Sequence, residues 1–106
     1  MRISESLPAT DLGRLGDLGE QPLELRAGPI TIPFRCDFTT SDSGSGVRVR
    51  GVGVSSGAGF TLDVELRPSG DAVDVEGDVL VSGTLAGLGQ REVGLQVRRL
   101  LSKYVA

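Results

Sequence analysis

Residues 60–81 decide the fold, and they read FTLDVELRPSGDAVDVEGDVLV. Apolar and polar side chains alternate over residues 60–67, and in the next segment Val73, Val75, Gly77, Val79 and Val81 alternate with Asp74, Glu76 and Asp78. Such alternation is typical of a strand with one buried and one solvent-facing side. Residues 68–71, which read PSGD, have the composition of a turn. The stretch therefore predicts two antiparallel strands joined by a short turn.

The same alternation extends the sheet toward the N-terminus. Residues 30–38 alternate without interruption, and Pro33 within them favours an edge position or a bulge because proline has no N–H. Residues 47–55 form a further strand in which the apolar phase changes at Gly51, so we predict a bulge or a bend there. With a weaker run at residues 23–26, an antiparallel meander of about five to six strands is expected, its main body spanning residues 30–82.

The periodicity changes after residue 83. Residues 84–105 lose the period of two and suit the period of an α-helix, for which Thr84 is a plausible N-cap. We therefore predict a long C-terminal helix over residues 84–105. The stripe on its apolar face is formed by Val93, Val97, Leu100, Leu101 and Tyr104.

Residues 1–29 carry the weakest pattern. The glycines at positions 13, 16 and 19 oppose a long helix. Leucines recur every third residue over 12–18 and allow a short helical turn capped by Thr10 or Asp11, whereas residues 1–7 suit a strand. Both alternatives stay open.

These segments fit one α+β domain spanning residues 1–106. A curved antiparallel sheet followed by one amphipathic helix buries its apolar surface when the helix lies across the concave face. Three inward glycines, Gly51, Gly53 and Gly77, either leave room for a ligand inside the sheet or are ordinary glycines at bends.

Composition excludes several classes of function. The chain has no His and one Cys, which excludes a His-based catalytic triad, a His/Cys zinc site and an internal disulfide. Its net charge of −3 argues against a nucleic-acid partner, although residues 91–106 alone are basic. No apolar run is long enough to span a membrane, and no secretory signal is evident, so we expect a cytoplasmic protein.

From Gly28 to Lys103 the chain resembles the CoxG-type proteins, which accompany carbon monoxide dehydrogenase and belong to the START/Bet v 1-like (SRPBCC) helix-grip superfamily. The more specific block is residues 81–91, VSGTLAGLGQR, which looks like the family's V-x-G-x-L-A-x-x-G-Q-R. A second block, residues 51–68, carries the paired glycines GVG and GAG and then LRP. Residues 27–29, AGP, resemble the family's approach to its central sheet. Members of the family open with a strand and two short helices, so residues 1–29 correspond to a shortened N-terminal region.

The resemblance implies a non-catalytic protein without a cofactor, in which a curved sheet grips the helix and a hydrophobic ligand lies between them. It also implies an accessory or membrane-recruitment role for a molybdenum hydroxylase such as carbon monoxide dehydrogenase, with a lipid or a quinone-like molecule as ligand. The same apolar residues also suit an ordinary core, which a domain of this size needs in order to fold. The candidate cavity residues are Phe34, Cys36, Phe38, Gly51, Gly53, Phe60, Leu62, Val64, Val75, Val79, Val93 and Val97.

The basic helix offers a candidate docking surface formed by Arg98, Arg99, Lys103 and Tyr104. Cations beside apolar residues allow peripheral contact with anionic lipid at the inner face of the membrane, or with a partner protein. The alternative is a solvated helix face whose cations suit the C-terminal end of the helix dipole.

Two other classes of function compete with ligand binding. In the first, the shortened sheet exposes an edge, and the chain homodimerises or docks to a partner there as an assembly module without a ligand. In the second the chain is an enzyme. Asp74, Glu76 and Asp78 share one solvent-facing side of a strand, and Cys36 has no His to activate it. We therefore expect no catalytic residues and no metal site.

Overall fold

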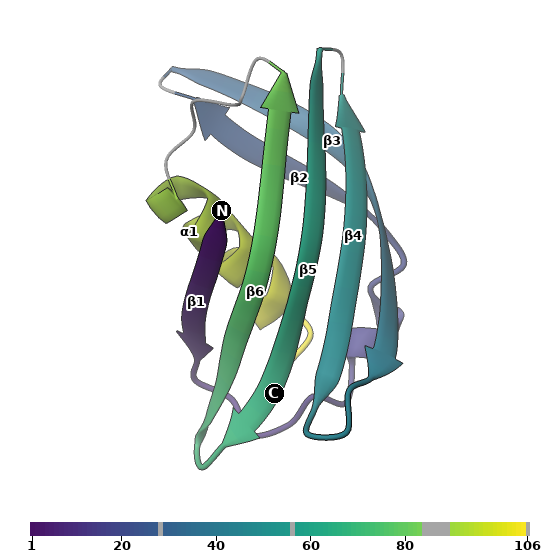
Figure 1. Cartoon of the computed structure of the whole chain (residues 1–106), viewed down its shortest axis with the longest axis vertical. Coiled ribbons are helices and arrows are strands. Elements are labelled where there is room, and N and C mark those ends of the chain that lie inside the picture. Colours follow the sequence, from purple (N-terminus) through teal and green to yellow (C-terminus); the bar gives the residue numbers. More distant parts are fainter. Residues whose placement is uncertain (28, 56, 84–89, 106) are drawn as a thin grey trace.

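The computed structural model describes residues 1–27, 29–55, 57–83 and 90–105 and consists of a curled six-stranded sheet with one helix on its inner side (Figure 1). Every neighbouring pair of strands is antiparallel, in the order β1-β6-β5-β4-β3-β2. The predicted curved antiparallel sheet with a C-terminal helix is thereby confirmed. The strands are β1 (Arg2–Leu7), β2 (Glu20–Ala27), β3 (Ile30–Asp42), β4 (Val47–Ser55), β5 (Ala58–Ser69) and β6 (Ala72–Gly83).

The helix α1 (Gln90–Ser102) packs against β1 and β2, which are the two edge strands of the sheet. It therefore lies on the inner side of the curled sheet, between the two edge strands (Figure 1). Its buried residues Val93, Val97, Leu100 and Leu101 join the same core as the inner face of the sheet.

The prediction of a helix continuing to Val105 is wrong. The helix ends at Ser102, and its last turn is tightened because the N–H of Lys103 bonds to the carbonyl of Leu100 (3.3 Å) and the N–H of Tyr104 to that of Leu101 (3.0 Å). The predicted start, with Thr84 as N-cap, falls on residues 84–89, outside the described part of the chain.

The predicted bulge at Gly51 is also wrong. Strand β4 keeps a continuous register with both neighbours, with Gly51 opposite Phe38 on one side and Leu62 on the other. The apolar phase changes because Gly51 and Gly53 occupy the buried positions, while Val52 and Val54 lie on the outer face. The strand remains regular, and two valines are left in solvent.

The N-terminal region contains both of the alternative elements, a strand and a helical turn. Strand β1 pairs along its whole length with β6, and a short 3₁₀ helix, η1 (Leu15–Asp17), follows it. Arg14, not Thr10 or Asp11, is the N-cap residue of η1, and Asp11 instead accepts a hydrogen bond from the N–H of Gly13 (2.8 Å). The buried Leu15 anchors η1 in the core.

Pro33 lies where β3 has a single neighbour. The pairing of β3 with β4 starts at Arg35, whereas its pairing with β2 starts at Ile30. The predicted edge position is therefore confirmed for the side of β3 that faces β4. Because β4 does not pair with β3 at Pro33, the missing N–H of this proline costs no hydrogen bond between strands.

Candidate functional site

The predicted cavity residues come together on the inner face of the sheet. The ten of them with side chains belong to one apolar core and are at most 4% exposed. The rings of Phe34 and Phe60 lie 6.1 Å apart at a tilt of 53°, as aromatic pairs in cores commonly do. Val93 and Val97 contribute to this core from α1. In the structure these ten side chains are therefore packed within the core.

The inward glycines do not leave open space. A Cβ atom at Gly51 would lie 2.5 Å from Cδ1 of Phe38, and one at Gly53 would lie 2.6 Å from Sγ of Cys36. At Gly77 the obstacle is the backbone of β5, with Cα of Val64 at 2.6 Å. The first two glycines make room for large side chains of β3, and the third lets two strands approach closely.

Cys36 is part of this packing. Its side chain is buried, and burial raises the pKa of the thiol to about 11 because the apolar surroundings disfavour a thiolate. A protonated, inaccessible thiol is a poor nucleophile.

A groove of about 500 Å³ lies between the edge strand β2 and the C-terminal half of α1. Two of its lining residues, Leu23 and Leu100, are buried members of the core and give the groove an apolar floor. The other lining residues form a polar rim that is exposed or half-buried. This rim consists of Glu24 from β2 and of Gln96, Arg99, Ser102 and Lys103 near the end of the chain, and the apolar Pro22 of β2 interrupts it.

The four predicted docking residues do not form one patch. Arg99 and Lys103 line this groove, whereas Arg98 lines a separate hollow beside Ser4 and Asp74, toward β1. Tyr104 is half-buried and packs against the core. The basic residues of α1 therefore face two different sides of the domain.

The outer face of the sheet carries a network of ion pairs. Arg48 makes a bidentate contact with Asp63 (both distances 2.7 Å), and Arg67 contacts Glu65 and Glu76 (both 3.1 Å). The hydrogen bonds and charge of the Arg48 guanidinium hold the pKa of Asp63 below its ordinary value.

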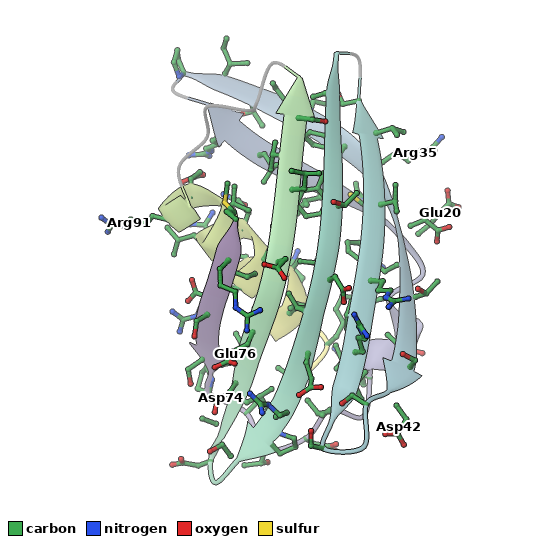
Figure 2. The ribbon with its side chains drawn as sticks, in the orientation of Figure 1. Glu20, Arg35, Asp42, Asp74, Glu76 and Arg91 are labelled. Carbon is green, nitrogen blue, oxygen red and sulfur yellow. The ribbon has the colours of Figure 1, made fainter. Side chains whose placement is uncertain are left out.

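The candidate catalytic acids belong to this network or lie beside it. Glu76 and Asp78 also pair with Arg2 (3.8 and 3.7 Å), and Figure 2 shows Asp74 and Glu76 on the outer side of β6. A hollow of about 620 Å³ lies over these charges. Each of its four arginines, Arg2, Arg48, Arg50 and Arg67, already has a carboxylate within 3.8 Å, so among its described lining residues the hollow has no free cation to hold an anionic ligand.

Three large apolar residues also lie on the outer face, where the sequence pattern predicted no site. Val52, Val54 and Leu80 are 59%, 64% and 63% exposed. Val52 and Leu80 both flank Thr61 of β5, and Val54 lies opposite Gly59. We call these three residues the outer apolar patch. The sequence signal for it is that each of them stands at a position on the outer face of its strand, where alternation would place a polar residue.

Among residues 1–27, 29–55, 57–83 and 90–105, no three His, Cys, Asp or Glu side chains are grouped so that they could hold a metal ion. Within the same part of the chain, no helix has the length and apolar character needed to cross a membrane. No protein-family model matches the chain, and no curated protein matches it significantly.

Proposed function

We propose that this domain is a non-catalytic protein that binds a hydrophobic molecule in the groove between β2 and α1. The observation that carries the proposal is an apolar floor, Leu23 and Leu100, beneath a polar rim. A volume of about 500 Å³ is within the usual range for small-molecule sites, which are commonly apolar with a few polar groups that orient the ligand. The ligand thereby lies at the border of sheet and helix, and the filled interior is left undisturbed.

The order of elements supports a helix-grip domain of the CoxG type. A first strand, a short helical segment, an antiparallel meander and a C-terminal helix follow each other as the resemblance implies. On this proposal the domain is an accessory or membrane-recruitment factor for a molybdenum hydroxylase, with a lipid or quinone-like ligand. Copurification of the chain with a molybdenum hydroxylase encoded by the same genome tests the partner; failure to copurify under conditions that preserve the hydroxylase would contradict it.

Ligand binding is tested by native mass spectrometry of protein purified without detergent. We expect an added mass that organic extraction removes. Ser102→Trp should reduce the bound fraction because an indole at this exposed position fills the groove. Leu95→Trp is the matched control, since Leu95 is exposed on the same helix but does not line the groove. Equal occupancy in the two variants would contradict the proposed site.

A second candidate function, docking to a partner protein or to a second copy, is favoured by the outer apolar patch. Exposed apolar residues gathered on one sheet face are typical of interaction surfaces. Val54→Lys should abolish such an association while leaving the fold intact, because Val54 is 64% exposed. Light scattering coupled to size exclusion would detect a dimer, and an unchanged dimer in Val54→Lys would exclude the patch as its interface.

A further inference from the structure

We infer that the groove between β2 and α1 selects an amphiphile with an acidic head group, of the fatty-acid class, which Arg99 and Lys103 hold by charge-assisted contacts. The inference rests on the proposed function, since it names the class of ligand for the same groove.

The cations of the outer face and those of the groove differ in whether they are paired with carboxylates. On the outer face, Arg2, Arg48, Arg50 and Arg67 each have a carboxylate within 3.8 Å. Arg99 and Lys103 form no ion pair with any residue of the described part of the chain. Their charges are therefore available to an anion that enters from solvent.

The balance of charge around the groove is positive. The groove is lined by two cations and one acid, Glu24. The carbonyl of Lys103, at the negative end of the α1 dipole, accepts a hydrogen bond from Nη2 of Arg14. This guanidinium offsets the negative end of the dipole, so the two lining cations outweigh Glu24 and the local field favours an anion.

Cations and apolar floor are aligned at the C-terminal end of α1. Gln96, Arg99 and Leu100 follow the three- and four-residue spacing of one helix face. Lys103 lies in the turn directly after the helix and lines the same groove. An acyl chain lying on Leu100 and Leu23 therefore brings its head group within reach of long, flexible cationic side chains. Arg and Lys commonly cover apolar surface with their stems and hold the charge at the water boundary.

An extended peptide fits this edge less well than a lipid. The N–H of Phe38 donates to the carbonyl of Gly19 (2.9 Å), so in the antiparallel ladder the even-numbered residues of β2 direct their backbone groups toward the free edge. Pro22 is one of them and has no N–H to donate. An added strand would lose a hydrogen bond in the middle of the groove, whereas an acyl chain needs none.

The test compares three probes of equal chain length, decanoate, decan-1-ol and decylammonium, by isothermal titration calorimetry at low ionic strength. Each exposed ion pair is worth a few-fold in affinity, so we expect decanoate to bind about tenfold more tightly than decan-1-ol. Arg99→Gln and Lys103→Gln should each reduce this preference about threefold, and the double variant should abolish it. Added salt should weaken it because the charges are at the surface.

Arg98→Gln is the matched control. It removes the same charge from the adjacent position of α1, but Arg98 lines the hollow toward β1. Retained preference in Arg98→Gln together with its loss in the double variant would support the inference. Equal binding of decanoate and decan-1-ol, or tighter binding of decylammonium, would overturn it and leave the proposed function standing. If none of the three probes binds, the proposed function fails with it.

Discussion

Replacing Gly51 by alanine adds one methyl group at a point on the inner face of the sheet that the Phe38 ring already fills. The new Cβ atom would lie 2.5 Å from Cδ1 of Phe38, about 0.9 Å short of the 3.4 Å at which ordinary contact begins. Phe38 is only 4% exposed, so its ring cannot move aside into solvent. Either the ring leaves its preferred rotamer or β3 and β4 separate.

The magnitude follows from two opposing effects. Overpacking of this kind costs about 1–3 kcal/mol, and the loss of glycine's freedom in the unfolded chain returns about 0.4–1 kcal/mol. We expect a net loss of about 1–2 kcal/mol in the free energy of unfolding. Urea unfolding followed by far-UV circular dichroism should show a midpoint lower by roughly 0.5–1 M with an unchanged slope.

Gly16→Ala is the matched control, because a Cβ atom at this position meets nothing within 4 Å. It should be neutral or slightly stabilising, so the two variants differ in sign. In a Phe38→Leu background Gly51→Ala should cost little, since the smaller side chain vacates the contested space. If Gly51→Ala alone lowers the free energy of unfolding no more than Gly16→Ala does, the reasoning is refuted. The hypothesis of an open cavity inside the sheet would then be restored.

Three further predictions concern a carboxylate, a thiol and the apolar face of α1. Arg48 lowers the pKa of Asp63, so the pair contributes stability above the carboxylate's unfolded pKa and loses it as pH falls through the lowered value. Asp63→Asn should therefore flatten the acid side of the stability–pH curve measured by urea titration, at a cost of about 1 kcal/mol or less near neutral pH; an unchanged curve would count against the pair. The Cys36 thiol, with its pKa raised to about 11, should react with Ellman's reagent at neutral pH only as fast as the chain unfolds; immediate reaction of the native protein would contradict its burial. Val97→Asp should unfold the domain, because a buried unpaired charge costs several kcal/mol, whereas Arg98→Asp should leave the circular dichroism spectrum unchanged; a folded Val97→Asp variant would show that the helix packs on another face.

Most of the sheet could be predicted because β3, β5 and β6 each carry an alternating pattern. In β5 and β6 the buried residues alternate with polar ones as the sequence does, and the turn between them was marked by proline and glycine. The apolar stripe of α1 was predictable for the same reason, and Val93, Val97, Leu100 and Leu101 are all buried. Local periodicity reports which side of an element is buried.

Local periodicity does not report what fills the buried side. In β4 the glycines occupy inner positions because Phe38 and Cys36 of the neighbouring strand extend over them, a fact that depends on the register between strands. Because the sequence does not show the register between β3 and β4, the change in the apolar alternation at Gly51 was interpreted as a bulge. The helical period likewise continues to Val105 in the sequence, although the helix ends at Ser102 and the backbone tightens at Lys103 and Tyr104.

The groove could not have been predicted from either of its two sides. Leu23 and Leu100 are far apart in the sequence, and each looks like an ordinary core residue within its own element. The groove exists because α1 packs against the free edge of β2, and only the three-dimensional arrangement separates Arg99 from its neighbour Arg98.

Pro22 links the two surfaces to which the candidate functions are assigned. It lines the groove and also a hollow of about 450 Å³ on the outer side of β2, to which Val54 of the outer apolar patch contributes. Glu20 and Arg35, labelled in Figure 2, flank this second hollow. A partner seated on the outer apolar patch would therefore reach the edge strand that borders the groove. On the proposed function, partner and ligand would then contact the same edge strand, β2, from its two sides.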